Sequence, residues 1–335
     1  MPSLTAARLW ANNWMAAGVA SAALLFAAPV AGDEARELLE KMAVAAREQS
    51  YQGDFVYERT GSFSTHRVWR QVDDQVVERL LRTDGAPQEW VRRDGRLECS
   101  SALTSGVAWR DSGLLADESF TLHQWYSLQV LGTSRVANRA VSVVAVKPRD
   151  PFRYAYELYL DADTGLLLQS LLINEKEALL ERFQFTNLEV GPVTPEQLSA
   201  VGACPAIGEQ AASDTTASAP AAEQRWLPAW LPPGFAPVRR ETRRLNGEEM
   251  PVVTQAFTDG LARFTVFIEP LAEDRVADDL RAQLGPTVAV SRRLVMRDGA
   301  YLATVVGEVP PATAERVAAS LAPDFDPGAV IDTAP

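Results

Sequence analysis

The sequence predicts an α+β fold that is mostly antiparallel β, for three reasons. From Gln52 to Val190, apolar and polar residues alternate in short runs, as they do in strands that bury one face. Turn signals such as Asp84-Gly85 and Asp94-Gly95 separate these runs, and no helical period replaces them. Strands joined by such hairpins run antiparallel, so we expect one large antiparallel sheet in this region.

The first 32 residues predict a secretory signal peptide. Arg8 supplies a short positive start, and an apolar stretch from Trp14 to Ala28 is followed by small residues. We expect cleavage after Ala31 or Gly32. The alternative is an uncleaved membrane anchor, because the apolar stretch approaches the roughly 18 residues that a membrane span needs.

Charge and length limit the class of protein further. The 335 residues have a formal net charge of −12, and removal of the signal peptide takes away one arginine and no acid, which gives −13. Such an acidic chain is a poor nucleic-acid binder, so no nucleic-acid partner is expected. The roughly 300 remaining residues exceed one ordinary core and suit two domains.

The two cysteines, Cys99 and Cys204, predict a disulfide. An exported chain reaches an oxidising compartment, where an even number of cysteines is typical of pairing; two separate thiols are the alternative. A bridge would close a loop of about 100 residues and could contribute up to about 4.7 kcal/mol in the chain-entropy model.

The first domain is expected over residues 33–204. It begins with an amphipathic helix from Asp33 to Gln49, whose apolar stripe must cover the sheet that follows. In the strand from Phe152 to Leu160, the even-numbered residues are apolar or aromatic. We therefore expect Phe152, Tyr154 and Tyr156 to share a buried face, opposite Arg153 and Glu157.

Residues 205–222 predict a linker, and residues 223–335 a smaller α+β domain. The linker is rich in Ala, Ser, Thr, Pro and Gly, with few branched apolar residues. In the second domain, Asp259-Gly260 and Asp298-Gly299 are expected as hairpin turns. An apolar stripe from Ala314 to Leu321 predicts a closing helix.

Residues that could carry chemistry are scarce. His66 and His123 are the only histidines, and neither has a second ligand at metal spacing. A nucleophile elbow, a phosphate-binding glycine loop and a Cys-x-x-Cys pair are all absent from the sequence. Carboxylates such as Glu157 and Asp161 leave a hydrolase as a minor alternative, but we expect no enzyme, cofactor or metal site.

Aromatic residues predict two binding surfaces instead. If the sheet curls, its concave face could hold an acyl chain; ordinary core under the helix is the alternative role. The candidates for this concavity are Trp69, Trp90, Trp109, Phe152, Tyr154 and Tyr156. In the second domain, an interdomain or partner surface is expected from Trp226, Trp230, Phe235, Phe264 and Phe267.

Five segments carry a family resemblance: QGDFVYERTGSFSTH at 52–66, ERLLRTDGAPQE at 78–89, WLPPGF at 230–235, DGLARFTVFIEP at 259–270 and VVGEVP at 305–310. In combination they resemble the MucB/RseB proteins, periplasmic regulators of envelope-stress sigma factors, and most closely the MucB branch. The likeness runs through both domains in order.

The resemblance implies a fold and a function. The large domain would be an open half-barrel like those of LolA and LolB, with helices in its concavity, beside the smaller α+β domain. Members bind the periplasmic domain of a transmembrane anti-sigma factor of the MucA/RseA kind and shield it from site-1 proteolysis. Lipid or lipopolysaccharide fragments would relieve this shielding.

Two functions therefore follow as hypotheses. The first is a periplasmic regulator that holds the anti-sigma factor and releases it on binding lipid. The second is a periplasmic carrier of lipid or lipoprotein of the LolA/LolB kind. In either case, the long open edges of a half-barrel are compatible with a homo-oligomer.

Overall fold

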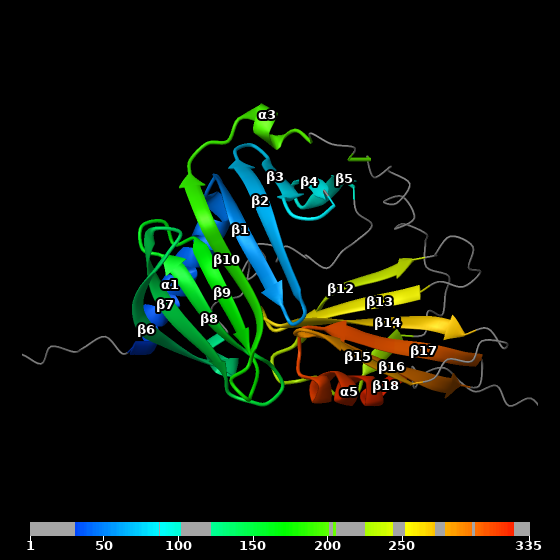
Figure 1. Ribbon diagram of the computed structural model, residues 1–335. Coiled ribbons are helices and arrows are strands. Elements are labelled where there is room, and N and C mark those ends of the chain that lie inside the picture. Colours follow the sequence, from blue (N-terminus) through cyan, green and yellow to red (C-terminus); the bar gives the residue numbers. More distant parts are fainter. Residues whose placement is uncertain are drawn as a thin grey trace, which may run out of the picture.

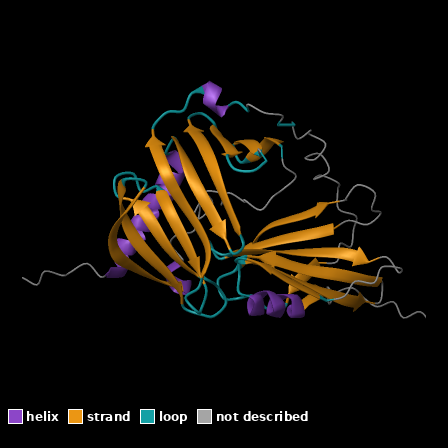
Figure 2. Cartoon of the chain, viewed as in Figure 1, coloured by secondary structure: helices purple, strands orange, loops and turns teal. Residues whose placement is uncertain are grey.

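The structure, a computed structural model, describes residues 31–86, 88–101, 122–200, 204–205, 225–243, 252–271, 279–296 and 299–324. These residues form two large antiparallel sheets, each with a helix on one face (Figure 1; Figure 2). Trp109 and nearly all of the predicted linker lie outside the residues whose side chains are described, and the predicted signal cleavage site, after Ala31 or Gly32, lies at the first described residues. The exact domain boundaries therefore stay predictions.

The first sheet has ten strands in the order β5-β4-β3-β2-β1-β10-β9-β8-β7-β6. All neighbours are consecutive in sequence except β1 and β10, whose antiparallel pairing joins the start of the domain to its end. The sheet curves without closing, which confirms the predicted open half-barrel. Its strands are β1 (Tyr51–Arg59), β2 (Ser62–Val72), β3 (Val76–Arg82), β4 (Glu89–Arg93), β5 (Arg96–Ser100), β6 (Tyr126–Val136), β7 (Arg139–Pro148), β8 (Ala155–Asp161), β9 (Leu167–Ile173) and β10 (Leu179–Val190).

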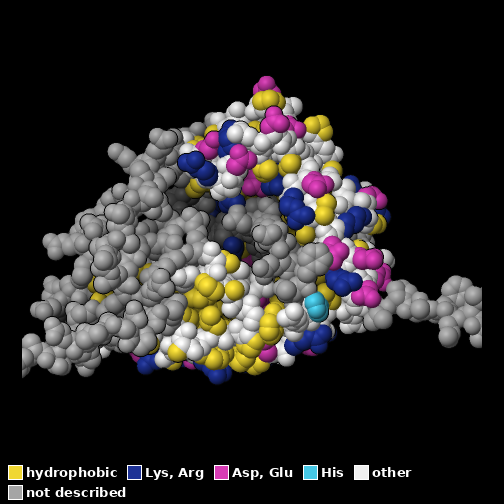
Figure 3. Space-filling view, turned by 180° about the vertical axis from the view of Figure 1, so that it is seen from behind, with side chains coloured by type: hydrophobic (Ala, Val, Ile, Leu, Met, Phe, Trp, Pro, Cys, Tyr) yellow, Lys and Arg dark blue, Asp and Glu magenta, His cyan; other side chains and the backbone are white. Residues whose placement is uncertain are grey.

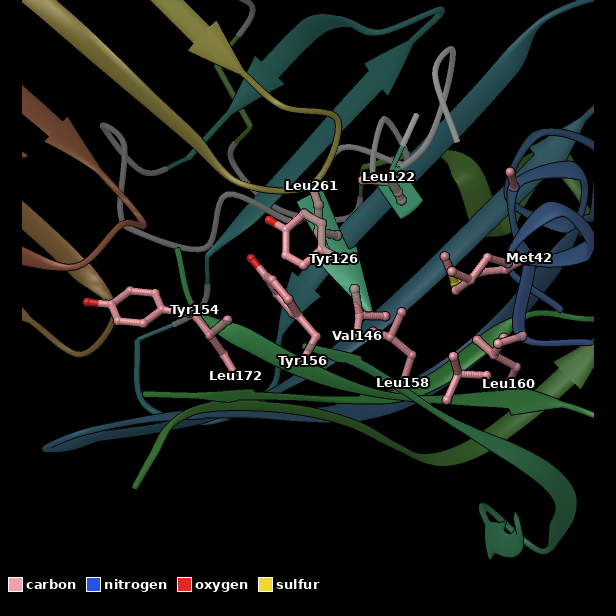
Figure 4. Packing of buried hydrophobic residues seen from close by; sticks show 14 of the residues in the cluster. Met42, Leu122, Tyr126, Val146, Tyr154, Tyr156, Leu158, Leu160, Leu172 and Leu261 are labelled. Atoms are coloured by element: carbon pink, nitrogen blue, oxygen red, sulfur yellow. The ribbon is translucent and has the colours of Figure 1, made fainter. Parts of the chain in front are cut away.

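A helix lies in the concavity of this sheet, as expected. In α1 (Ala31–Glu48), Asp33 and Glu34 occupy the first turn, where negative charge suits the helix dipole. Its buried stripe packs against the apolar face of the strands, and Figure 4 shows Met42 facing Leu158 and Leu160. Two one-turn helices, α2 (Leu122–Trp125) and α3 (Pro195–Leu198), complete the described part of this domain.

The second sheet has six strands in the order β12-β13-β14-β17-β16-β15. α5 (Pro311–Ser320) covers one face through the buried residues Ala314, Val317 and Ala318, which confirms the predicted closing helix. The strands are β12 (Ala236–Arg243), β13 (Val252–Thr258), β14 (Arg263–Leu271), β15 (Leu280–Leu284), β16 (Thr287–Met296) and β17 (Gly299–Gly307). A separate ribbon pairs β11 (Arg225–Pro228) with β18 (Leu321–Asp324).

The predicted alternation in β8 is correct for the strand but wrong for the residues before it. Tyr156 is buried in the core, as expected, and so is Tyr154 just before the strand. Phe152, however, lies in the turn between β7 and β8, outside any strand. Arg153 lies in the same turn and is 3% exposed, so it does not belong to a solvated face.

Candidate partner and ligand surfaces

A buried arginine joins the two domains. The side chain of Arg153 is fully enclosed, and its Nη1 donates to Oδ2 of Asp259 at 2.7 Å. Its Nη2 donates to the carbonyl oxygen of Pro233 at 2.5 Å, and its Nε to Oδ1 of Asp150 at 3.2 Å. Each nitrogen of the guanidinium group thus has an acceptor, and two of these acceptors belong to the second domain.

The carboxylate of Asp259 is held from both sides of the domain boundary. Asp259 lies in the predicted turn between β13 and β14, where its Oδ1 accepts from the backbone N–H groups of Leu261 (2.9 Å) and Ala262 (2.7 Å). Its Oδ2 accepts from the hydroxyl of Tyr126 in β6 at 2.9 Å, besides Arg153. The second domain therefore orients the carboxylate, and the first domain supplies the side-chain donors.

Burial and charge act in opposite directions on this pair. Burial raises the pKa of Asp259, whereas the backbone N–H of Leu261 and the positive charge of Arg153 lower it. Burial also raises the pKa of the Tyr126 hydroxyl, and the negative charge of Asp259 raises it further. Tyr126 therefore stays protonated and can donate its hydrogen bond at any physiological pH.

Apolar and aromatic contacts surround the ion pair. The guanidinium carbon of Arg153 lies 5.8, 5.4 and 5.2 Å from the ring centroids of Trp125, Tyr126 and Phe235. Gly234 has φ of +85°, and a Cβ there would lie 2.3 Å from the Trp125 ring, so only glycine fits. Leu261 of the second domain joins the core cluster of the first.

A second contact lies beside α5. Phe152 and Trp230 meet edge to face with ring centroids 5.1 Å apart, and Arg316 of α5 lies over the Trp230 ring at 4.0 Å. The hydroxyl of Thr313 in α5 donates to the carbonyl oxygen of Phe152 at 3.1 Å. Phe152 and Trp230 thus form a second contact between the two domains.

The residues predicted for a partner surface have different positions. Phe235 and Phe264 are buried in the core beneath α5, and Trp230 is half-buried at the domain contact. Phe267 is half-buried. It lies an odd number of positions after the buried Phe264 in β14, so it points to the opposite face of the sheet, away from α5. Trp226 pairs with Pro323 in the β11–β18 ribbon, and its side chain lies outside the described set.

The face of the second sheet opposite α5 is the one that carries Phe267. Register places Thr304 of β17 beside Phe267, and Ser291 of β16 beside Thr304. In Figure 1 this face is turned toward the β1–β5 side of the half-barrel. It is therefore the candidate surface for a partner that touches both domains.

The aromatic residues predicted for a lipid concavity do not form one surface. Tyr154 and Tyr156 belong to the same buried cluster as residues of α1, but Figure 4 shows them away from that helix, with Tyr156 beside Tyr126 and Tyr154 beside Leu172. Trp90 pairs with Leu80, and Leu80 pairs with Val68; paired residues share a face, so Trp90 and Val68 point the same way. Trp69, next to Val68, points to the opposite face, and Arg79 lies over its ring at 4.3 Å.

The concave face of β1–β4 contains ion pairs. Arg70 pairs with Glu78, and both side chains are about 5% exposed. Arg92 lies 3.8 Å from the other oxygen of Glu78, and Nη2 of Arg70 donates to the carbonyl oxygen of Ala46 in α1 at 2.7 Å. Figure 3 shows basic side chains inside a hollow near the centre of the molecule.

A disulfide closes the far edge of the first domain. Cys99 in β5 and Cys204 are joined, with 5.4 Å between their Cα atoms, which confirms the predicted pair. The backbone N–H of Ser100 also donates to the carbonyl oxygen of Pro205 at 3.2 Å. The segment that leaves the domain is thus tied to the edge strand.

No group of three or more His, Cys, Asp or Glu side chains among the described residues is placed to hold a metal ion. No helix in the same residues is long and apolar enough to cross a membrane.

Sequence reasoning missed the residues that join the domains. It treated Asp259 as a turn residue and Arg153 as part of a polar strand face, whereas the two side chains are partners across 106 positions. Tyr126 and Trp125 were not among the residues predicted for either surface. The burial of Arg153 between Phe152 and Tyr154 has no local signature, because its acceptors come from the other domain.

Comparisons with known proteins cover both domains. The model of the MucB/RseB N-terminal domain matches residues 34–207, and that of the MucB/RseB C-terminal domain matches residues 220–322. The chain belongs to the MucB/RseB family. Its sequence is 50% identical to the sigma factor AlgU regulatory protein MucB of Pseudomonas aeruginosa, over 87% of this chain and 92% of that protein. It is 27% identical to the sigma-E factor regulatory protein RseB of Escherichia coli K12, over 92% of this chain and 97% of that protein.

Solved structures of MucB share the architecture of this MucB/RseB chain. MucB in the P. aeruginosa MucA/MucB complex matches with a TM-score of 0.74 and 48% identity, over 87% of this chain and 99% of that one. A crystal structure of MucB with MucA(peri) matches with a TM-score of 0.72 and 49% identity, over the same shares of the two chains. The predicted family and the predicted two-domain fold are both confirmed.

Proposed function

We propose that this chain binds the periplasmic domain of a MucA/RseA-like transmembrane anti-sigma factor and so restrains an envelope-stress sigma factor. The observation that carries the proposal is the 50% identity to a MucB that spans both domains, together with the likeness to MucB in complexes with MucA. The chain acts in the periplasm as a regulator rather than as an enzyme. The regulatory names of its relatives support this role.

Binding shields the anti-sigma factor from site-1 proteolysis. The surface that supports this role is the open face of the second sheet, which faces the half-barrel and carries Phe267. A segment lying there would touch both domains at once, so a protease could not reach it. The half-buried Phe267 would supply an apolar anchor for such a segment.

Lipid or lipopolysaccharide releases the anti-sigma factor. Tyr154 and Tyr156 are buried in the first domain's core, so an acyl chain can reach them only if the side chains that cover them move away. The basic side chains in the hollow could bind an anionic headgroup at the same time. Lipid entry would therefore change the surface that the partner uses.

The binding test uses the mature chain and the periplasmic domain of the MucA-like protein from the same genome, with affinity measured by calorimetry. We expect wild-type binding, a loss of about tenfold for Phe267→Ala, and no change for Leu131→Ala, an exposed residue of β6 in the other domain. Absence of wild-type binding would overturn the function. Wild-type affinity of Phe267→Ala would overturn only the surface.

A second experiment tests release. Lipopolysaccharide is titrated against the chain with and without the bound anti-sigma domain, and both affinities are measured. If lipid weakens the protein complex, the complex must weaken lipid binding by the same factor. Equal lipid affinity in both cases would rule out the competitive mechanism, and transfer of acyl chains to vesicles without anti-sigma binding would support the carrier instead.

A further inference from the structure

The interdomain ion pair differs from an ordinary buried pair because its two charges belong to different domains. Arg153 comes from the β7–β8 turn and Asp259 from the β13–β14 turn, and both side chains are fully enclosed. In Figure 1 the half-barrel and the smaller sheet meet near the centre of the molecule. Any change in domain orientation must therefore act on this pair.

A small displacement and a full separation have opposite electrostatic consequences. A shift of a few ångströms (about one hydrogen-bond length) would break the 2.7 Å contact, leaving Asp259 buried without a counter-charge and Arg153 with only the partly exposed Asp150 of its own turn, which is unfavourable. Full separation would expose both charges to water, and hydration would replace the lost contact. Partly open arrangements are thus disfavoured relative to both docked and separated ones.

The apolar contacts around the pair do not have this directional character, although the hydrogen bond from Thr313 to the carbonyl oxygen of Phe152 does. The Phe152–Trp230 contact and the burial of Leu261 are apolar, and apolar burial depends mainly on area rather than on angle. Arg153, by contrast, needs the carbonyl oxygen of Pro233 and the carboxylate of Asp259 at fixed positions. Orientation is therefore determined by the polar contacts.

We propose that Arg153, Asp259 and Tyr126 form an interdomain latch that gives the two domains one docked orientation and makes their undocking all-or-none. The latch holds because the turn of the second domain orients Asp259 through Leu261 and Ala262 before the first domain docks. The inference does not depend on which partner the chain binds. Its test accordingly needs no partner.

The test measures the distance between the domains in the full mature chain. Spin labels are attached to cysteines introduced by Asp74→Cys, in the exposed turn between β2 and β3, and Val295→Cys, on exposed β16. Both natural cysteines are in the disulfide, so labelling without reductant is selective. Pulsed electron resonance then gives the full distance distribution, in which the unaltered latch should show one narrow population.

Asp259→Asn is the decisive variant. It keeps the oxygen that accepts from the turn N–H groups but leaves Arg153 buried against a neutral group, so a second, separate population should rise by about tenfold or more. Adding Arg153→Met should return most molecules to the docked population. Tyr126→Phe, which removes one hydrogen bond and no charge, should give a smaller second population.

Asp161→Asn is the matched control. Asp161 is also buried and pairs with Arg139 at 2.8 Å while accepting from Thr164, but all three residues belong to the first domain. Its variant should keep the narrow wild-type distribution. The latch is wrong if Asp259→Asn and Tyr126→Phe both keep it too, if the distribution broadens continuously, or if the double variant is as open as the single one.

Discussion

The two halves of the ten-stranded sheet bury different chemistry. Strands β7–β9 pack aliphatic side chains against α1, and the buried Asp161 there pairs with the partly exposed Arg139, whereas in β2–β4 both partners are buried in the ion pairs Arg70–Glu78 and Arg79–Glu89. Apolar packing is non-directional, so the contacts of α1 with β7–β9 constrain its position little, whereas the hydrogen bond from Arg70 to the carbonyl oxygen of Ala46 ties the end of α1 to β2. Ion pairs need fixed partners. We call the β7–β9 side of the sheet the apolar wall and the β2–β4 side the charged wall, and we infer that the ion pairs fix the shape of the charged wall more firmly.

The largest expected effect comes from breaking an ion pair of the charged wall. Glu78→Gln leaves the buried Arg70 without a counter-charge and should lower the free energy of unfolding by about 4 kcal/mol, measured by urea denaturation. Glu98→Gln removes one partner of the exposed pair Arg93–Glu98 and should cost less than about 1 kcal/mol. Equal losses for the two variants would contradict the comparison.

A double variant separates pairing from burial in the same wall. Arg70→Met combined with Glu78→Gln removes both charges, so it should recover much of the stability that Glu78→Gln loses. The loss of the bond from Arg70 to the carbonyl oxygen of Ala46 limits this recovery. No recovery at all would mean that packing, not charge, explains the first result.

The apolar wall should respond through lost packing. Leu158 in β8 is 1% exposed beneath α1, and Leu158→Ala should lower the free energy of unfolding by about 3 kcal/mol through cavity formation. Leu131→Ala, at a β6 residue that is 47% exposed, should change it by less than about 0.5 kcal/mol. If Leu158→Ala were as mild as its control, α1 would not cover this face tightly in solution.

Local features of the fold could be predicted from sequence, but the face of the sheet to which each tryptophan points could not. The alternation in β8 and the Asp259-Gly260 turn depend on neighbouring residues, so one sequence suffices to predict them. Whether Trp69 and Trp90 share a face depends on the register of three strands, which alternation within each strand does not reveal.

Removing the disulfide tests how much stability this bridge adds at the β5 edge of the charged wall. Cys99→Ser with Cys204→Ser opens a loop with a sequence separation of 105 and should destabilise the chain by about 3 kcal/mol. Thermal unfolding of the variant, and of the wild type with reductant, should agree. If reductant also changed the thermal unfolding of the variant, reductant would be acting on something other than this bridge.

Acid should weaken the charged wall through a histidine. His66 in β2 is 3% exposed, its ring stacks on Phe55 at 5.0 Å, and its Nε2 lies 2.8 Å from Oγ of Ser64. Burial lowers the pKa of His66 from 6.5 to about 4, with Asp84 and Arg82 acting in opposite directions. Between these two values the unfolded chain binds a proton and the folded chain does not, so stability falls as the pH falls.

His66→Gln removes the titratable imidazole and introduces a side-chain amide that can still hydrogen-bond to Ser64. Between pH 7 and pH 4.5, the wild type should lose about 2 kcal/mol more unfolding free energy than the variant, because the imidazole must stay neutral in the folded state. His123→Gln, at the exposed imidazole, is the matched control and should follow the wild type. If His66→Gln also follows the wild type, the acid sensitivity of the charged wall does not come from this histidine.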